Sequence, residues 1–256
     1  MDFRAVEENL RESFRVLAQG RSRADVVELP GLSIASLGGS FQMFNAAFLS
    51  APVATVAELE ERIGTAHEHF RRRNRAWSFW VCEDWLERGL RRRLSRTCDR
   101  FGLRLTTEMP GMTACSLDVP SRDLPRPEFR RVEPGPTLDD FRAIGSDCFH
   151  VPMAWFSEVF DESLRDRAFV CWVGYEGGVP VSTAATVTSG ATAGIYNIAT
   201  SPSFRGKGYG EAITRHAIAA ALPARRIILQ STAQGLSLYR RIGFDAVTRI
   251  LVYNSL

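Results

Sequence analysis

The sequence predicts a mixed α/β fold, an α+β mixed sheet, organised in two successive halves, and three observations support this. Apolar residues recur at helical spacing in some segments and form short runs in others, so helices and strands are both expected. Several expected strands follow one another directly, unlike the strict alternation of a doubly wound sheet. A proline-rich segment divides the 256 residues near the middle, and each part is long enough for a domain.

The first half is expected to mix strands and helices. Apolar residues at three-to-four-residue spacing predict a helix at 6–17. Thr55, followed three residues later by Glu58, matches a capping box at the start of a second helix. The expected elements of this half are a helix at 6–17, strands at 25–29, 32–37 and 42–49, a helix at 56–73, a strand at 76–82, a helix at 86–101 closed by Gly102, and a hairpin at 103–117 turning at Pro110-Gly111.

The boundary between the halves is placed at the proline-rich segment, residues 120–127. It contains three prolines in eight residues, and proline neither continues a helix nor donates to a central sheet. We therefore predict a first domain at 1–119, a linker at 120–128 and a second domain at 129–256.

The second half is expected to contain more consecutive strands than the first. Gly177-Gly178 marks a turn between two of them, and a glycine-rich turn precedes its longest central helix. The expected elements are a strand at 129–133, helices at 138–148 and 155–163, strands at 168–175, 179–189 and 193–200, a helix at 209–221, a strand at 226–231, a helix at 236–242 and a final strand or hairpin at 246–254.

Composition and charge exclude several classes of protein. Apolar residues make up 45% of the chain and charged residues 24%, so extended disorder is not expected. A net charge of +3 gives little general attraction to nucleic acid. The first residues do not show the charged start and apolar core of a signal peptide, so none is expected, and no apolar stretch reaches the roughly 18 residues of a membrane span. We expect a cytoplasmic protein, monomer or homodimer, without nucleic-acid or membrane partners.

The five cysteines predict neither a disulfide framework nor a metal site. They are widely spaced, include no Cys-x-x-Cys pair and have no histidine at metal-ligand spacing. The runs at 71–73 and 91–93 are the densest arginine clusters, but acidic neighbours such as Glu61, Glu83 and Glu87 favour solvated helix faces over a nucleic-acid site.

The glycine-rich turn at 205–210 is the strongest candidate for a binding site. Glycines at 206, 208 and 210 leave room for a diphosphate to approach the main chain, and the following helix adds its partial positive charge. Arg205 and Lys207, the only lysine of the chain, add full charges. An ordinary glycine-rich turn is the alternative, because a glycine triplet alone is a weak motif. The spacing fits neither a nucleoside-triphosphate loop nor a Rossmann loop.

Two blocks together resemble the GCN5-related N-acetyltransferase (GNAT) family. Arg205-Gly206-Lys207-Gly208-Tyr209-Gly210, after Ile198-Ala199-Thr200 and Pro202, is similar to its acetyl-CoA motif, Gln/Arg-x-x-Gly-x-Gly/Ala. The block from Leu229 to Phe244 is similar to its later strand, helix and Gly-Phe turn. The resemblance covers about half the chain and implies the GNAT acyl-CoA N-acyltransferase fold, with acetyl-CoA as co-substrate and no metal.

The resemblance also implies roles for individual residues. A strand end that splays from its neighbour pairs with the pantetheine arm, and the amides of the glycine turn bind the diphosphate. Tyr239 occupies the position that protonates the departing thiolate, although it could also be a buried helix aromatic. Many members carry Asn where this chain has Thr232. The implied cofactor-binding residues are Ile198, Ala199, Thr200, Arg205, Gly206, Lys207, Gly208, Tyr209, Gly210, Glu211 and Thr232.

The general base is harder to assign from the sequence. His150 is the best candidate by its chemistry, but a lone histidine after Phe149 is more often structural. Asp147, Glu158 and Tyr196 are weaker candidates.

The first half resembles the back part of the second. It has the order strand, helix, strand, helix, and Phe101-Gly102 follows its last helix as Gly243-Phe244 follows the counterpart. The glycine loop is missing, because Leu49-Ser50-Ala51-Pro52-Val53 occupies that turn. We interpret this half as a degenerate GNAT-like copy that does not bind the cofactor, with an unrelated α/β cap as the alternative.

The expected function is therefore N-acetyl transfer from acetyl-CoA to a primary amine of a small molecule or protein, through a ternary complex. A non-catalytic acyl-CoA sensor is the alternative, in which the loop survives and the chemistry is lost.

Overall fold

The computed structural model describes residues 2–161 and 168–256, which form two compact units. The first unit contains Met1–Gly111, Gln230–Ala233 and Ala246–Leu256, and the second contains Met112–Leu229 and Gln234–Asp245. The two units differ from the expected domains 1–119 and 129–256: residues 112–128, with the expected linker 120–128, are counted with the second unit, and Gln230–Ala233 and Ala246–Leu256 are counted with the first. Among the described residues, no helix is both long and apolar enough to cross a membrane.

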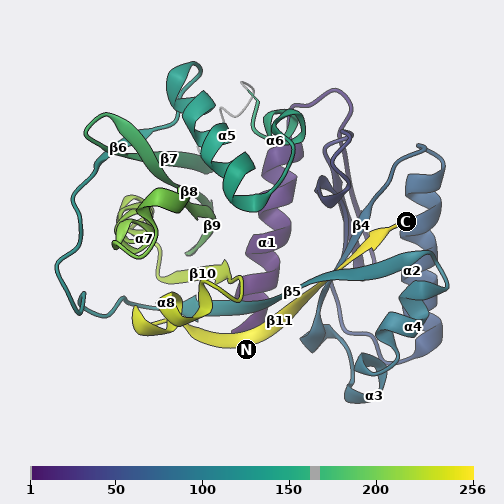
Figure 1. The fold of residues 1–256 in the computed structure, drawn as a ribbon. Helices are drawn as coiled ribbons and strands as arrows, with labels where there is room; N and C mark the ends of the chain where they lie inside the picture. The colour runs from purple at the N-terminus through teal and green to yellow at the C-terminus, as the bar shows by residue number, and fades with distance from the viewer. Residues whose placement is uncertain (1, 162–167) are drawn as a thin grey trace. The chain divides into compact units, whose positions relative to one another are not determined.

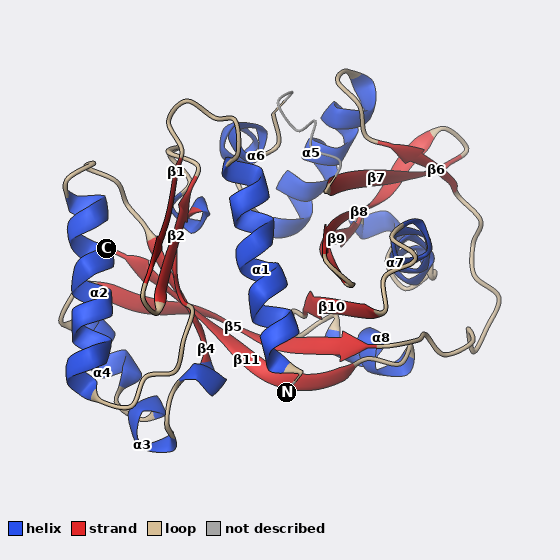
Figure 2. Ribbon diagram, turned by 180° about the vertical axis from the view of Figure 1, so that it is seen from behind, coloured by secondary structure: helices blue, strands red, loops and turns tan. Residues whose placement is uncertain are grey.

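The first unit combines a mixed sheet with two long helices (Figures 1 and 2). Its strands follow the order β1-β2-β3-β4-β11-β5, with β3 parallel to β4 and β4 antiparallel to β11. Its elements are α1 (Phe3–Ala18), β1 (Asp25–Leu29), β2 (Leu32–Ser36), the 3-10 turn η1 (Gln42–Phe44), β3 (Asn45–Leu49), α2 (Val56–Arg71), β4 (Ser78–Cys82), η2 (Glu83–Trp85), α3 (Arg88–Arg91), α4 (Leu94–Asp99), β5 (Leu103–Ala114) and β11 (Asp245–Ser255).

The predicted capping box at the start of α2 is confirmed. The Thr55 side chain accepts from the Glu58 amide at 3.2 Å, and the Glu58 carboxylate accepts from the Thr55 amide at 3.3 Å. These bonds satisfy N–H groups that a helix start otherwise leaves without partners.

The hairpin predicted at 103–117 is wrong, because β5 is one strand of 12 residues. Gly111 serves close packing here, not a turn. A Cβ at this position would lie 2.5 Å from the Thr248 side chain and 2.9 Å from that of Val6. A glycine inside a strand often marks such a close approach.

The helix predicted at 86–101 is also wrong in its extent, because it is broken into α3 and α4. Val53 forms a parallel bridge with Leu86, and its amide donates to the Trp85 carbonyl at 2.7 Å. This bridge keeps Leu86 extended, so the first helix starts only at Arg88. The first three residues of the strand expected at 42–49 form η1 instead.

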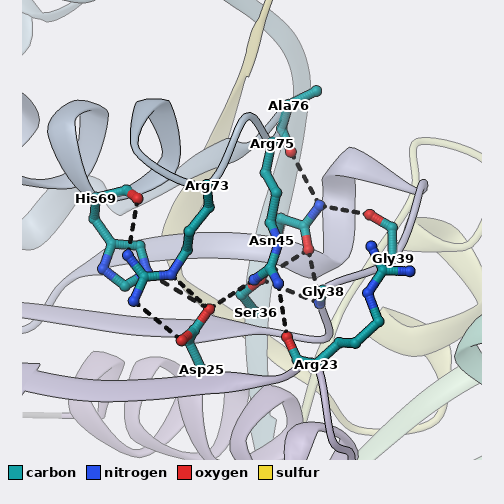
Figure 3. A network of polar contacts seen from close by, with 10 residues as sticks. All are labelled: Arg23, Asp25, Ser36, Gly38, Gly39, Asn45, His69, Arg73, Arg75 and Ala76. Atoms are coloured by element: carbon teal, nitrogen blue, oxygen red, sulfur yellow. Dashed lines mark hydrogen bonds and ion pairs between the residues drawn. The ribbon is translucent and has the colours of Figure 1, made fainter.

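The buried side-chain amide of Asn45, in β3, forms hydrogen bonds with neighbouring segments of the first unit (Figure 3). Asn45, only 1% exposed, accepts from the Ser36 hydroxyl at 2.8 Å and from the Gly38 amide at 3.1 Å. Its amide nitrogen donates to the carbonyls of Gly39 and Ala76, both at 3.0 Å. Together these bonds link the end of β2, the loop after it and the segment before β4 to Asn45.

We expect Asn45→Ala to lower the free energy of unfolding by about 3 kcal/mol, because it leaves buried donors and acceptors without partners. Urea denaturation of the whole chain measures this. Asn254→Ala is the matched control: the Asn254 side-chain oxygen is buried without a hydrogen bond among the described residues, so its removal is expected to cost less than about 1 kcal/mol. Equal losses of unfolding free energy in the two variants would contradict the stabilising role of the Asn45 hydrogen bonds.

The second unit is a sheet with helices on both faces. Its strands follow the order β10-β9-β8-β7-β6, antiparallel except for the parallel pair of β9 and β10. Its elements are β6 (Glu128–Arg131), α5 (Pro136–Phe149), α6 (Met153–Val159), β7 (Phe169–Glu176), β8 (Val179–Ser189), β9 (Thr192–Thr200), the 3-10 turn η3 (Pro202–Phe204), α7 (Tyr209–Ala220), β10 (Arg226–Gln230) and α8 (Leu236–Arg241). The helix expected at 155–163 begins at Met153, and residues 162 and 163 lie outside the described residues.

Helices α5 and α7 position the candidate site by packing on the same strands. Both contact β7, β8 and β9, and Figures 1 and 2 show α5 on one side of these strands and α7 on the other. The core under α7 and α8 is formed by small and branched residues, including Ala184, Ile195, Ile213 and Ile227. Burial of these side chains fixes the strand and the helix on either side of the glycine turn.

The two units share one order of elements. In the first unit, β2 and β3 are antiparallel, α2 follows, and β4 lies parallel to β3. In the second, β8 and β9 are antiparallel, α7 follows, and β10 lies parallel to β9. This repetition agrees with the interpretation of the first half as a GNAT-like copy.

Candidate active site

The carboxyl end of β9 has a free edge. Its described pairing with β10 runs from Thr192↔Arg226 to Gly194↔Ile228 and stops there, whereas its pairing with β8 continues to Thr200↔Ser182. Beyond Gly194, no ladder pairing joins β9 to β10 in the part of the chain that the structure describes. Such an edge can pair with an extended ligand, as predicted for Ile198, Ala199 and Thr200.

A bulge lies in β9 within this free edge, and it was not predicted from the sequence. The register between β8 and β9 shifts after Thr183, and Asn197 has a φ of +49°. The Thr183 hydroxyl donates to the Asn197 carbonyl at 2.9 Å, which holds the bend. Bulges often lie next to active sites because they re-aim main-chain groups. Asparagine tolerates positive φ better than most residues, and this was the only signal in the sequence.

The glycine turn after β9 presents a row of main-chain donors at the start of α7. Gly206 and Gly208 have φ values of +76° and +99°, which favour glycine. In the part of the chain that the structure describes, no side chain caps this helix and no carbonyl accepts from the amides of Gly206 through Glu211 with good geometry. Together with the helix dipole, these amides form a site suited to a phosphate group.

Side-chain charges around the turn are arranged to favour an anion. Arg205 and Lys207 are exposed. The Glu211 carboxylate is buried, and Arg215 at 2.8 Å and Arg241 at 3.4 Å neutralise it. The acidic residue in the first turn therefore does not repel a bound phosphate, and the Arg241 pair joins α8 to α7.

The glycine at 210 allows α7 to lie close to the end of β9. A Cβ there would lie 3.1 Å from the Thr200 hydroxyl, tighter than normal contact. The Thr200 carbonyl accepts from the Arg205 guanidinium at 3.1 Å and from the Cys148 thiol at 3.3 Å. Strand end, glycine turn and the last turn of α5 thus meet at Thr200.

Tyr239 lies in α8 and packs into the core beneath β9. It is 7% exposed, belongs to the same cluster as Ile195, and makes an edge-to-face contact with Phe244 at 6.0 Å. Burial raises the pKa of its phenol above the ordinary value, so the hydroxyl keeps its proton at neutral pH. A protonated phenol is the form that a general acid requires.

Comparison with protein-family models decides which family this geometry belongs to. Residues 167–246 match the model described as the acetyltransferase (GNAT) domain. This stretch is a GNAT domain. It covers β7 to α8, and so it includes the free edge of β9, the glycine turn and Tyr239.

Solved structures similar to the whole chain share the fold. A GCN5-related N-acetyltransferase from Kribbella flavida is 18% identical with a TM-score of 0.71, covering 98% of this chain and 95% of that one. A functionally unknown conserved protein from Staphylococcus epidermidis is 13% identical with a TM-score of 0.66, covering 91% and 94%. A GCN5-related N-acetyltransferase from Sphaerobacter thermophilus is 15% identical with a TM-score of 0.58, covering 88% and 76%. Comparison with curated proteins found no match.

The candidate bases lie on or at the end of three different elements of the second unit. Asp147 and His150 are exposed at the end of α5, where His150 adopts a φ of +55° as the residue that ends the helix. Glu158 lies on α6, and Tyr196 lies on β9 next to the bulge. This structural role of His150 agrees with the alternative that the sequence left open, and no single base is assigned.

Thr232 lies in the segment Gln230–Ala233, which is counted with the first unit. Its side chain is exposed, and its carbonyl accepts from the Ser231 hydroxyl at 2.7 Å. Its role in cofactor binding stays a prediction. Among the described residues, no group of three or more His, Cys, Asp or Glu could hold a metal ion.

The turn of the first unit that corresponds to the glycine loop is filled by the protein's own side chains. The Arg62 guanidinium donates to the carbonyls of Ala51 at 2.9 Å and Pro52 at 3.1 Å. The Glu58 carboxylate accepts from the Ala54 amide at 2.8 Å as well as from Thr55. A carboxylate therefore accepts from the main-chain amides at the start of α2, at the turn that corresponds to the glycine turn before α7.

Proposed function

We propose that this chain is an N-acetyltransferase that moves an acetyl group from acetyl-CoA to a primary amine of a small molecule or protein. The observation that carries the proposal is the row of unpaired amides at 206–211, which follows directly from the free edge of β9. An edge for an extended amide-containing arm, followed by a turn for a diphosphate, fits the order of groups in coenzyme A.

The proposed reaction requires the chain to bind the pantetheine arm, to stabilise the charge on the thioester oxygen and to protonate the departing sulfur. The free edge of β9 would hold the pantetheine arm, and the bulge at Asn197 would turn main-chain donors toward the thioester oxygen, where charge develops during attack. The amine forms a C–N bond as the C–S bond breaks. The Tyr239 hydroxyl would give its proton to the departing sulfur, while the acceptor amine loses a proton to water or to a side chain.

Titration calorimetry with acetyl-CoA, followed by a thiol-release assay over a panel of primary amines, tests the proposal. We expect micromolar binding of acetyl-CoA and release of free coenzyme A with at least one amine. Binding without turnover on any amine would favour the acyl-CoA sensor instead. Absence of binding at millimolar acetyl-CoA would contradict both functions.

A further inference from the structure

The arginine runs at 71–73 and 91–93 differ in their partners. All three side chains of the first run form ion pairs with carboxylates of the first unit, with the closest N–O distances between 2.6 and 2.9 Å. In the second run, Arg91 is paired at 3.0 Å. The side chains of Arg92 and Arg93 are exposed and have no ion pair or hydrogen bond among the described residues. Two neighbouring guanidiniums are therefore free to bind a ligand.

The two free arginines line a cavity of about 540 Å³ in the first unit. One wall of the cavity is the start of α2, and the other is the segment from Glu87 to Arg93, which includes α3. All of the lining residues lie outside the GNAT domain at 167–246. The volume is in the usual range for a small-molecule site.

The main chain holds the two arginines in place at the break between α3 and α4. Arg92 is the residue that ends α3, and Arg93 is the residue before the start of α4. The Arg93 amide donates to the Leu90 carbonyl at 2.8 Å, and the Arg93 carbonyl accepts from the Thr97 amide at 2.9 Å. Guanidiniums held side by side can form several charge-assisted hydrogen bonds to one phosphate group.

The main-chain amides at the start of α2 are not the anion site of this cavity. The Glu58 carboxylate accepts from the amides of Ala54 at 2.8 Å and of Thr55 at 3.3 Å, so these donors are already used. Anion binding here therefore depends on side-chain charge, unlike the binding proposed for the glycine turn of the second unit.

The other lining groups favour a ligand that carries hydroxyl groups. The Thr55 hydroxyl accepts from the Glu58 amide at 3.2 Å, and its own hydrogen has no acceptor among the described residues. Glu87 is the only acidic residue that lines the cavity. Its carboxylate can accept hydrogen bonds from hydroxyl groups but would repel a second anionic group of the ligand. Val56 and Leu90 provide apolar contact for a carbon skeleton.

From this geometry we infer that the cavity of the first unit binds a phosphorylated small molecule with hydroxyl groups, a sugar or polyol phosphate. Arg92 and Arg93 hold the phosphate, and Glu87 and Thr55 contact the hydroxyl groups. The inference goes beyond the proposed function and does not depend on it, because it uses no residue of the proposed acetyl-CoA site.

Titration calorimetry with glycerol 3-phosphate tests the inference on the full chain and on the double variant Arg92→Ala/Arg93→Ala. The wild type is expected to bind this probe with a Kd of about 1 mM or below, and to bind neutral glycerol not at all. The double variant is expected to lose at least about tenfold in affinity. Its free energy of unfolding is expected to equal that of the wild type, because the removed side chains have no partner among the described residues. Urea denaturation checks this.

Two control variants separate the cavity from other positive charge. Arg88→Ala/Arg96→Ala removes two exposed arginines of the same helices that do not line the cavity, and Arg205→Ala/Lys207→Ala removes the charges at the glycine turn. Both are expected to bind glycerol 3-phosphate as the wild type does. An equal loss in the first control would show general attraction only, and a loss confined to the second would place the phosphate at the glycine turn.

Either of these results would overturn the inference, as would a wild type that does not bind glycerol 3-phosphate. Tighter binding of L-malate than of glycerol 3-phosphate would also overturn it, because the cavity would then select a carboxylate. The proposed function is tested separately by the binding of acetyl-CoA, and it stands whichever of these results is found.

Discussion

Replacing Gly208 with aspartate is expected to abolish the binding of acetyl-CoA, with a loss of at least about 100-fold in affinity. The new carboxylate would stand at the N-cap of α7, beside the amides proposed to hold the diphosphate. Two like charges about 4 Å apart near a protein surface repel each other by several kcal/mol. An N-cap aspartate would also accept from the amides itself, as Glu58 does in the first unit. Calorimetry with acetyl-CoA measures the loss.

Two controls separate charge from shape in this experiment. Gly208→Ala meets the same 2.9 Å contact with Pro125 and the same φ of +99°, but it adds no carboxylate, so it is expected to lose less affinity than the aspartate. Gly177→Asp introduces the same side chain at another glycine of positive φ, +57°, in the turn between β7 and β8 with nothing within 4 Å. It is expected to bind acetyl-CoA normally. Full affinity in Gly208→Asp would refute the assignment of the turn.

The parts of the site that the sequence predicted are those made by local patterns. The glycine turn, the strand before it and the helix after it lie within one continuous stretch, so spacing and residue type were enough to find them. The capping box at Thr55 and Glu58 was predicted for the same reason. Each of these features depends on residues a few positions apart, which fix the main-chain conformation almost independently of the rest of the fold.

The parts that the sequence did not predict depend on residues far apart in the chain. Gly111 was expected to form a turn, and only the proximity of Thr248 shows that it serves close packing inside a strand. The bulge at Asn197 depends on a hydroxyl from the neighbouring strand. The proline-rich segment was predicted as a linker between the two halves, and its contact with Gly208 in the second unit cannot be derived from its composition. Long-range packing of this kind is absent from any local pattern.

The neutralised carboxylate of Glu211 shows how the two sequence blocks of the GNAT domain depend on each other. Glu211 follows the glycine turn, and Arg241 belongs to the later block that contains Tyr239. The ion pair between them joins the helix that would bind the diphosphate to the helix that carries the proposed acid. The resemblance of both blocks to one family is therefore matched by a physical contact between them in the structure.

Tyr239→Phe is expected to lower kcat for acetyl transfer by about 100-fold and to leave the affinity for acetyl-CoA unchanged. The substitution removes only the hydroxyl, which burial keeps protonated, and general-acid catalysis typically contributes this much or more. The Tyr239 ring, its contact with Phe244 and its place in the core are retained. Thiol release at saturating acetyl-CoA and amine measures kcat, and calorimetry measures the affinity.

Tyr253→Phe is the matched control for this experiment, because Tyr253 is also a buried tyrosine but lies in the first unit, where its hydroxyl pairs with Ser95 at 2.9 Å. Its kcat is expected to equal that of the wild type. A Tyr239→Phe variant with unchanged kcat would show that the phenol is only a packed aromatic and that sulfur is protonated from another source. A parallel loss of acetyl-CoA affinity would show that the hydroxyl serves binding in place of proton transfer, because a group that acts only in the transition state lowers kcat and leaves ground-state binding intact.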